Sequence, residues 1–272
     1  MQSEKMIFLG GGNMTRAIIS GLIKNHYPPK KIIVIDRNPE KCAFFTEHFG
    51  MTANSNLQDH LPEAGVIILA IKPQDAKTAC PSIQAHCKTH SPLILSIMAG
   101  LTVNTLSEWL GEKLAIIRAM PNTPSAIQDG AAGLFANRHC TPAQKNQAES
   151  ILRATGVISW VDTEPDLATI TALSGSGSGY YFYFMEIMEA VAIKMGISAD
   201  TAHLFAAQTA YGAAKLALES PESFAQLRGH VTSKGGSTAA AIASMQTNHL
   251  TNVLENAMIA CRDRALELAK GS

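Results

Sequence analysis

Two short loops rich in glycine and hydroxyl residues are the segments of this chain best suited to bind ligands. The first, Gly10-Gly11-Gly12-Asn13-Met14, follows an apolar run and precedes a segment with helical spacing. Glycines here let the backbone turn sharply and approach a pyrophosphate, whose charge the following helix N-terminus stabilises. At the end of a first buried strand, the pattern predicts a dinucleotide site. Thr15 stands where the dinucleotide fingerprint has Gly or Ala, so we expect the helix slightly farther from the strand.

The second loop lies late in the chain and runs from Ser233 to Thr238. Together with Ser174–Gly179, it places hydroxyls and free backbone N–H groups before an expected helix, an arrangement suited to binding a carboxylate. Lys234 lacks the surrounding residues of a nucleotide-binding P-loop. Ser174–Gly179 and Ser233–Thr238 both interrupt dense helical sequence, where flexible linkers are uncommon.

The residues after the second apolar run bear on the choice of coenzyme. Asp36 favours the free 2′-hydroxyl of NAD, whereas Arg37 and Asn38 can bind the 2′-phosphate of NADP. The two signals conflict. We expect NADPH, with NADH as the alternative.

Three further segments follow apolar runs and are expected at the same edge of a sheet. They are Ala70–Pro73, Ser96–Gly100 and Arg118–Pro124. Open α/β sheets bind ligands at the carboxyl ends of their strands. Asn122, held between two prolines, is therefore expected to contact the nicotinamide ribose or amide.

A metal site is not expected. His86, Cys87 and His90 have a suggestive spacing but lie in a polar segment without a fourth ligand nearby, so we interpret them as a solvated helix end. His230, close to the second loop, is expected to pack or to meet water.

The elements that position these residues alternate between short apolar runs and segments of helical spacing. This alternation predicts an α/β fold with a Rossmann-type, doubly wound parallel sheet over residues 1–162. Helices are expected in the connections, one of them over Thr102–Leu110 with Thr102 as its cap. The expected strands are Met6–Leu9, Ile32–Ile35, Val66–Ile71, Leu93–Ile97, Leu114–Met120 and Val157–Val161.

From Glu164 onward the chain shows no convincing strand, and alanine becomes dense. We expect an all-α domain over residues 163–272, with helices at Tyr180–Met195 and Thr251–Ala269 and another capped by Ser198. Apolar residues on several helix faces predict a dimerisation domain, although a compact monomeric bundle is an alternative.

Composition excludes several classes of protein. The chain has 272 residues with 46% hydrophobic and 16% charged residues, so it is not intrinsically disordered. With 22 Lys+Arg against 22 Asp+Glu and no basic block, nucleic acid is not an expected partner. The longest apolar run, Val66 to Ile71, is far below the ~20 residues that span a bilayer, so no membrane association is expected. Five cysteines without a C-x-x-C pattern indicate reduced thiols and a cytoplasmic location.

Five motifs in order along the chain resemble those of the pyrroline-5-carboxylate reductase family. The motifs are Gly10-x-Gly12-Asn13-Met14, Ala70-x-Lys72-Pro73-Gln74, Met120-Pro-Asn-Thr-Pro124, Ser174-Gly-Ser-Gly177 and Ser233-x-Gly-Gly-x-Thr238. The resemblance implies NAD(P)H-dependent reduction of the cyclic imine 1-pyrroline-5-carboxylate to L-proline by a homodimer, which in this family is often part of a decamer. The chain departs from the family pattern at Ser178, Lys234 and Pro221.

The resemblance also implies roles for individual residues. Thr238 would face the imine nitrogen and act with Ser233 in catalysis, while the substrate would be held by Ser233, Gly236, Ser237 and Thr238. Expected coenzyme contacts, including those inferred above from the residues alone, are Leu9, Gly10, Gly11, Gly12, Asn13, Met14, Arg37, Asn38, Asn56, Ala70, Ile71, Lys72, Pro73, Ile97, Met98, Ala99 and Asn122.

Two other functions remain open from the sequence. Another imine reductase or a β-hydroxyacid dehydrogenase of the same architecture would carry a catalytic Lys or Asp on the long helix after the dinucleotide domain, where Tyr180–Met188 offers only Glu186. A non-enzymatic nucleotide sensor would not need the Ser233–Thr238 loop.

Overall fold

The computed structural model describes residues 5–270, which fold into two compact units. The first contains the chain up to Ser176 together with the segment from Cys261 onward, and the second is Gly177–Ala260. The expected boundary between residues 162 and 163 concerns functional domains and stays a prediction.

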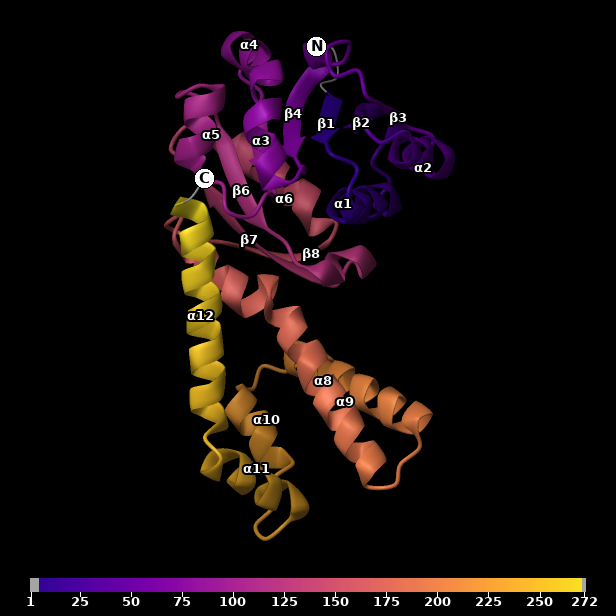
Figure 1. Ribbon diagram of the computed structural model, residues 1–272, viewed down its shortest axis with the longest axis vertical. Helices are drawn as coiled ribbons and strands as arrows, with labels where there is room; N and C mark the ends of the chain where they lie inside the picture. The colour runs from indigo at the N-terminus through magenta and orange to yellow at the C-terminus, as the bar shows by residue number, and fades with distance from the viewer. Residues whose placement is uncertain (1–4, 271–272) are drawn as a thin grey trace. The chain divides into compact units, whose positions relative to one another are not determined.

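An eight-stranded sheet forms the centre of the first unit, with strand order β3-β2-β1-β4-β5-β6-β7-β8 (Figure 1). The strands are β1 (Lys5–Leu9), β2 (Ile32–Ile35), β3 (Thr52–Asn54), β4 (Ala64–Leu69), β5 (Leu93–Ser96), β6 (Ile116–Met120), β7 (Gly130–Ala136) and β8 (Gly156–Trp160). Its helices are α1 (Asn13–Lys24), α2 (Pro39–Phe49), α3 (Pro73–Ala79), α4 (Pro81–His90), α5 (Val103–Leu110), α6 (Pro142–Arg153) and α7 (Asp166–Ile170). Short 3₁₀ turns occupy Pro29–Lys31, Leu61–Glu63 and Thr123–Ile127. The doubly wound α/β fold expected from the sequence is confirmed.

Strict alternation of side chains along the central strands builds one core on each face of the sheet. One row pairs in register across five strands through Ile33, Ile7, Ile67, Ile94 and Ile116. All five are at most 1% exposed and belong to the core that α3, α4 and α5 cover.

The residues one position further along each strand form the second row. Val34, Phe8, Ile68, Leu95 and Ile117 also pair in register and are fully buried. They pack in the core that α1, α2 and α6 cover on the opposite face. Apolar residues at consecutive positions are therefore required, because both faces of the sheet are covered by helices.

The sheet departs from the expected pattern at its two edges. β3 and β7 were not among the expected strands, and β7 runs antiparallel to β6 while β8 runs parallel to β7. The expectation of a wholly parallel sheet is therefore wrong at this end. Thr52–Asn54 is short and partly exposed, and the glycine and alanine content of Gly130–Ala136 gives a weak strand signal, so neither segment forms a long apolar run.

Helix caps lie where the sequence places them. The Thr102 hydroxyl accepts a hydrogen bond from the Thr105 N–H at 3.1 Å, and the Ser198 hydroxyl accepts one from the Thr201 N–H at 3.4 Å. Each cap satisfies a backbone donor that lacks a partner within the first turn of the helix. The expected helix starts after Thr102 and Ser198 are therefore confirmed.

The second unit is helical throughout. It comprises α8 (Gly177–Lys194), α9 (Ala199–Glu219), α10 (Phe224–His230), α11 (Ser237–Thr247) and the first half of α12 (Leu250–Lys270). Helices α8 and α9 pack against each other, burying Ala202 and Ala206. Large apolar side chains nevertheless stay exposed within this unit, among them Tyr181 at 69% and Phe205 at 65%.

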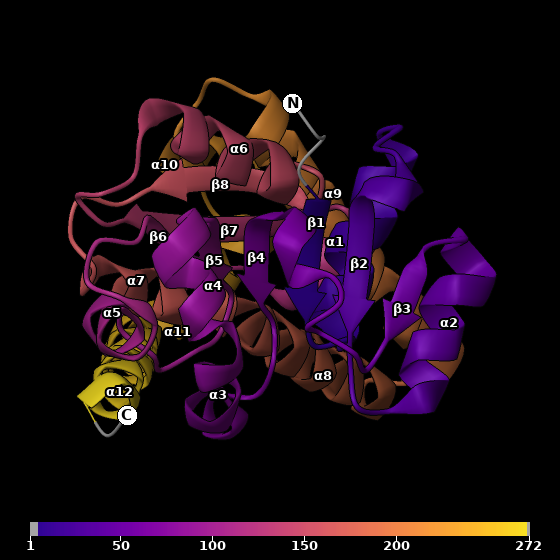
Figure 2. The same cartoon turned by 90° about the horizontal axis from the view of Figure 1, so that it is seen from above.

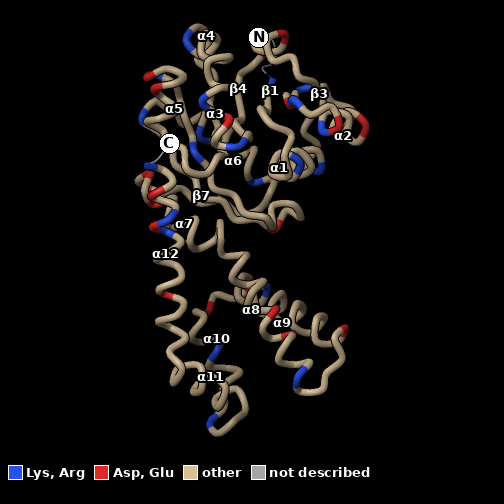
Figure 3. Tube along the Cα trace, viewed as in Figure 1, with Lys and Arg blue, Asp and Glu red and all other residues tan. Residues whose placement is uncertain are grey.

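Charged residues are sparse along α8 and the middle of α9 (Figure 3). Exposed apolar residues in such number are typical of a protein interface, which fits the dimerisation role expected for this part of the chain. Among residues 5–270, every helix is either too short or too polar to cross a lipid bilayer.

Candidate functional site

The turn after β1 lies at the point where several strands of the sheet end. The Gly10 N–H donates to the Ile35 carbonyl at 2.8 Å, and the Ala70 N–H donates to the Leu9 carbonyl at 2.9 Å. Ile97 in turn donates to the Leu69 carbonyl at 3.1 Å. The segments after β1, β2, β4 and β5 are thus brought to one edge of the sheet, as Figure 2 shows from above. This edge holds most of the predicted coenzyme contacts.

Gly10 and Gly11 are glycines for reasons of space and backbone conformation. Gly10 has a φ of +104°, and a Cβ there would lie 2.6 Å from the Ala70 carbonyl oxygen. A Cβ on Gly11 would lie 2.9 Å from the buried ring of Phe45. Both glycines allow close packing of the turn against its neighbours.

Gly12 differs from the two glycines before it. It caps α1 with ordinary extended backbone, and a Cβ there would meet no described atom within 4 Å. The space beside Gly12 therefore lies open at the start of a 12-residue helix whose first turn has no acidic residue. Free N–H groups and open space suit the pyrophosphate of a dinucleotide, so the residues present fit this coenzyme.

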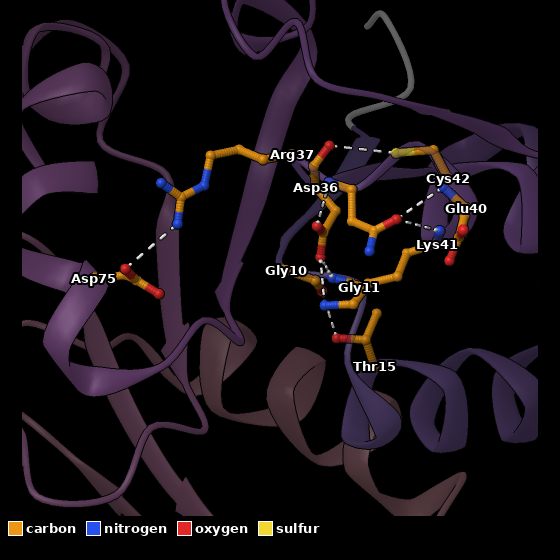
Figure 4. A network of polar contacts seen from close by, with 10 residues as sticks. Gly10, Gly11, Thr15, Asp36, Arg37, Glu40, Lys41, Cys42 and Asp75 are labelled. Carbon is orange, nitrogen blue, oxygen red and sulfur yellow. Dashed lines mark hydrogen bonds and ion pairs between the residues drawn. The ribbon is translucent and has the colours of Figure 1, made fainter.

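Thr15 is accommodated by a hydrogen bond within the turn. Its side chain is fully buried, and the hydroxyl donates to the Gly10 carbonyl at 2.6 Å. The hydroxyl thereby satisfies a backbone acceptor in the glycine turn. Figure 4 shows Thr15 reaching back to Gly10 from α1.

The carboxylate of Asp36 is directed at the glycine turn. Its Oδ2 accepts from the Gly11 N–H at 2.7 Å and lies 3.3 Å from the Lys41 Nζ, while its Oδ1 accepts from the Asn38 N–H at 2.9 Å (Figure 4). Partial burial would raise the pKa of Asp36, but the hydrogen bonds from Asn38 and Gly11, together with Lys41, lower it below its ordinary value. Asp36 is therefore ionised at neutral pH and holds the turn in place.

The two residues after Asp36 have separate local partners. The Arg37 guanidinium is 86% exposed and lies 3.3 Å from the Asp75 carboxylate in the first turn of α3. The Asn38 side-chain oxygen caps α2 by accepting from the Glu40 N–H at 2.8 Å. The Asn38 amide nitrogen and the Arg37 guanidinium are the donors with which these residues can bind a phosphate. An open depression lined by Asp36–Glu40 lies beside them.

The remaining predicted coenzyme residues lie in different surroundings. Lys72 caps α3 and is exposed, while Met98 is 3% exposed and Ala99 is exposed. Asn56 follows the edge strand β3, and its side-chain amide donates to Asp59. The coenzyme role of each stays a prediction.

Asn122 connects two of the motifs singled out in the sequence. Its Nδ2 donates to the Ser174 carbonyl at 3.2 Å, and its Oδ1 accepts from the Ala131 N–H at 2.9 Å. Ser174 lies in a π-helical turn, Thr171–Gly175, a feature that often marks functional sites. Asn122 therefore positions the start of the Ser174–Gly177 motif, and its contact with the nicotinamide stays a prediction.

A cavity of about 280 Å³ opens next to Ala99 within the first unit. Its wall is mostly apolar and contains one ion pair, in which Arg118 Nη1 lies 2.5 Å from Glu164 Oε1. This pairing is not evident from the sequence, because the two residues come from distant elements and neither carries a local signal.

The Ser233–Thr238 loop lies in the second unit and ends at α11. The Gly236 N–H donates to the Ser233 carbonyl at 3.0 Å, and Gly235 has a φ of +75°. A Cβ on Gly236 would lie 2.5 Å from the Ser233 hydroxyl oxygen, so glycine there lets the Ser233 side chain keep its position in the turn. Gly236 caps α11 without a described side-chain bond, which leaves the N-terminal amides of this helix for an anion.

Two histidines singled out in the sequence, His86 and His230, both have defined partners in the structure. His86 is 8% exposed and stacks on His90 with ring centroids 4.3 Å apart, so the expectation of a solvated helix end is wrong for His86. His230 Nε2 lies 3.3 Å from Glu222 Oε1 on the segment before the Ser233–Thr238 loop, a pairing that is not evident from the sequence. Over residues 5–270, no three metal-ligating side chains are grouped to hold an ion.

Comparison with known proteins places both units in one family. Residues 164–268 match the family model described as pyrroline-5-carboxylate reductase dimerisation, and residues 5–100 match the one described as NADP oxidoreductase, coenzyme F420-dependent. A pyrroline-5-carboxylate reductase of Pasteurella multocida is 39% identical over 274 residues, covering 99% of both chains.

Solved structures agree with this placement. A pyrroline-5-carboxylate reductase of Coxiella burnetii superposes with a TM-score of 0.95 at 41% identity, covering 98% of this chain and 99% of that one. A Plasmodium falciparum pyrroline carboxylate reductase with NADP bound shares the fold, with a TM-score of 0.86 at 24% identity over 99% of each chain. The chain belongs to the pyrroline-5-carboxylate reductase family.

Proposed function

We propose that this protein reduces the cyclic imine of 1-pyrroline-5-carboxylate to L-proline, the last step of proline biosynthesis. The observation that carries the proposal is the 39% identity to a reductase of that name over 99% of the chain, which includes both ligand-binding loops. The coenzyme is NADPH, with NADH as the alternative.

The coenzyme's contribution is a hydride delivered from the nicotinamide to the imine carbon. The turn Gly10–Met14 and the N-terminus of α1 would hold the pyrophosphate, since Gly12 leaves open space at that helix start. The remaining coenzyme contacts are assigned to the strand-end segments already described. No metal is part of this proposal.

The acid would be held by the second unit. The substrate carboxylate is bound by the hydroxyls of Ser233 and Ser237 and by the backbone amides at the start of α11. These groups combine hydroxyl donors with the N-terminus of an 11-residue helix. Thr238, half-buried in the first turn of α11, orients the ring nitrogen. The imine needs only one proton on nitrogen, so positioning by these groups supplies most of the catalysis, an effect worth about 7–11 kcal/mol in favourable cases.

A second function on the same architecture is a β-hydroxyacid dehydrogenase or another imine reductase. Such an enzyme would carry a Lys or Asp on α8, where residues 180–188 offer only Glu186. The purified chain should therefore oxidise NADPH with 1-pyrroline-5-carboxylate and be inactive with NADP and short β-hydroxyacids. Turnover of the hydroxyacids without turnover of the imine would refute the proposal.

The assembly follows from the surface of the second unit. We propose a homodimer formed through the exposed apolar residues of α8 and α9, with a decamer as the further assembly. Native mass spectrometry tests both: a subunit of 29.0 kDa gives a clear mass for each state. A monomer would contradict the proposal.

We also propose a cytoplasmic location and a functional domain boundary between residues 162 and 163. All five cysteines are free thiols, as a reducing compartment would maintain them. Expression of residues 1–162 alone tests the boundary: we expect a folded fragment that binds NADPH, less stable than the full first unit because Arg118 and the Val103 N–H lose Glu164.

A further inference from the structure

The ion pair between Arg37 and Asp75 joins two segments on either side of β1. Arg37 follows β2, whereas Asp75 lies in the first turn of α3, after β4. In the sheet, β2 and β4 are the two neighbours of β1, which carries the glycine turn. The pair therefore connects the two flanks of the predicted coenzyme site, with Arg37 Nη2 at 3.3 Å from Asp75 Oδ1.

Asp36 and Arg37 leave the end of β2 in different directions. Figure 4 shows Asp36 directed at Gly11 and Lys41, and Arg37 reaching away toward Asp75. The Asp36 carboxylate already accepts bonds from Gly11 and Asn38. The negative charge of Asp36 is therefore neutralised within the glycine turn and does not engage Arg37. The partner of Arg37 is Asp75, and this exposed ion pair can be exchanged for another anion.

We propose that Asp75 determines coenzyme preference by competing with the 2′-phosphate of NADPH for the Arg37 guanidinium. The inference rests on the proposed function, because it needs the adenosine end of the coenzyme beside Asp36–Asn38. NADH has no 2′-phosphate, so it binds without exchanging the partner of Arg37. Asp75 thus weakens NADPH binding selectively.

The exposure of the pair sets the expected size of the effect. The two side chains are 86% and 45% exposed, and ion pairs of this kind are weak in water. A phosphate carries close to two charges and binds guanidinium through two hydrogen bonds, so it displaces a single carboxylate contact. Removing Asp75 also removes a negative charge that repels the phosphate. We expect a change of roughly three- to tenfold in NADPH affinity.

The test measures dissociation constants for NADPH and NADH by calorimetric titration of the full chain without substrate. Asp75→Asn should tighten NADPH binding three- to tenfold and leave NADH within twofold. Arg37→Ala should weaken NADPH binding and leave NADH within twofold. In the Arg37→Ala background, Asp75→Asn should change NADPH binding less than twofold, because the competition no longer exists.

A matched control separates competition from general charge. Glu40 lines the same depression as Arg37, and Glu40→Gln removes the same charge without touching the Arg37–Asp75 pair. It should change NADPH affinity less than twofold. Asp75→Ala repeats the removal of the carboxylate, and the thermal midpoint of each variant verifies that it folds.

Three results would overturn the inference while leaving the proposed function intact. They are unchanged NADPH affinity in Asp75→Asn, equal tightening of both coenzymes, and an effect of Glu40→Gln as large as that of Asp75→Asn. A wild-type chain that binds neither coenzyme would instead refute the proposed function, and the inference with it.

Discussion

Arg118, in the middle of β6, forms an ion pair with Glu164, 46 residues further along the chain. The same carboxylate oxygen accepts a hydrogen bond from the Val103 N–H at 2.7 Å, at the first residue of α5. The side chains of Arg118 and Glu164 are only 11% and 20% exposed. One glutamate thus joins a central strand, a helix start and the segment that leads into α7.

We predict that Glu164→Ala lowers the free energy of unfolding of the first unit by about 3 kcal/mol. The loss arises because the mostly buried Arg118 charge and the Val103 N–H both lose their described partner. Urea unfolding followed by tryptophan fluorescence measures it, since both tryptophans, Trp109 and Trp160, lie in this unit.

Arg153→Met is the matched control for that experiment. Arg153 forms an ion pair with Glu149 on the surface of α6, where its side chain is 59% exposed. Its removal should cost about 0.5 kcal/mol or less. If Glu164→Ala and Arg153→Met lowered the free energy of unfolding equally, burial of the Arg118–Glu164 pair would make no contribution to stability.

The glycine turn gives a prediction that separates stability from binding. Gly12→Ala should lower the free energy of unfolding by no more than about 1 kcal/mol, because its Cβ meets open space and the cost is limited to that of a poorer helix N-cap. It should raise the NADPH dissociation constant more than tenfold, since the added methyl fills the space assigned to the pyrophosphate. Unchanged NADPH affinity would place the coenzyme elsewhere.

Gly11→Ala, in contrast, should reduce the stability of the fold itself. Its Cβ would press on Phe45, whose ring is fully buried, so we expect a loss of about 1–3 kcal/mol in the free energy of unfolding. Urea midpoints of the two alanine variants give the comparison. A larger stability loss for Gly12→Ala than for Gly11→Ala would contradict the assignment.

How far the sequence predicted this fold depended on the length of the apolar runs. β1 and β4 were predictable because large apolar side chains fill both faces, whereas β7 was missed because Gly133 is small where Ile170 packs against the strand. Caps such as Thr102 were predictable because they depend on neighbours three residues away.

Candidate site residues were predictable where their role depends on neighbours in the sequence, and not where it depends on distant segments. The glycine turn was identifiable because its chemistry lies within five consecutive residues. The partners of Arg37 and Arg118 were not, because Asp75 and Glu164 meet them only after the sheet has formed. Burial of His86 was missed because Gln84–Ser91 is polar in composition, although α4 turns this one ring inward.

Thr238 gives the prediction closest to the chemistry. Thr238→Ala should lower kcat more than tenfold and leave the NADPH dissociation constant near that of the wild type, because its hydroxyl is assigned to the imine nitrogen. Thr238→Ser keeps a hydroxyl and should recover most of the activity. Equal loss of turnover and coenzyme binding would indicate a structural role for the loop.

Stability should fall in mild acid because of His86. Burial lowers the pKa of His86 below its ordinary 6.5, and the charge of His90 lowers it further. Below about pH 6.5 the unfolded chain therefore binds a proton that the folded chain does not, so the free energy of unfolding decreases as pH falls, by at most about 1.4 kcal/mol per pH unit. Urea midpoints at pH 7 and pH 5.5 measure the change.

His86→Gln should make the midpoint less dependent on pH, while His48→Gln, at an exposed position on α2, should retain the wild-type dependence. Identical pH dependence in wild type and His86→Gln would show that this ring does not titrate differently in the folded chain.

The central claim is that the coenzyme bound at the glycine turn reduces a cyclic imine. Its most direct test is to incubate the purified chain with NADPH carrying deuterium at both C4 positions and with 1-pyrroline-5-carboxylate, and then to identify the product by mass spectrometry and NMR. The account predicts L-proline with one deuterium at C5, the former imine carbon. Consumption of the coenzyme without labelled proline, or no consumption at all, would contradict it.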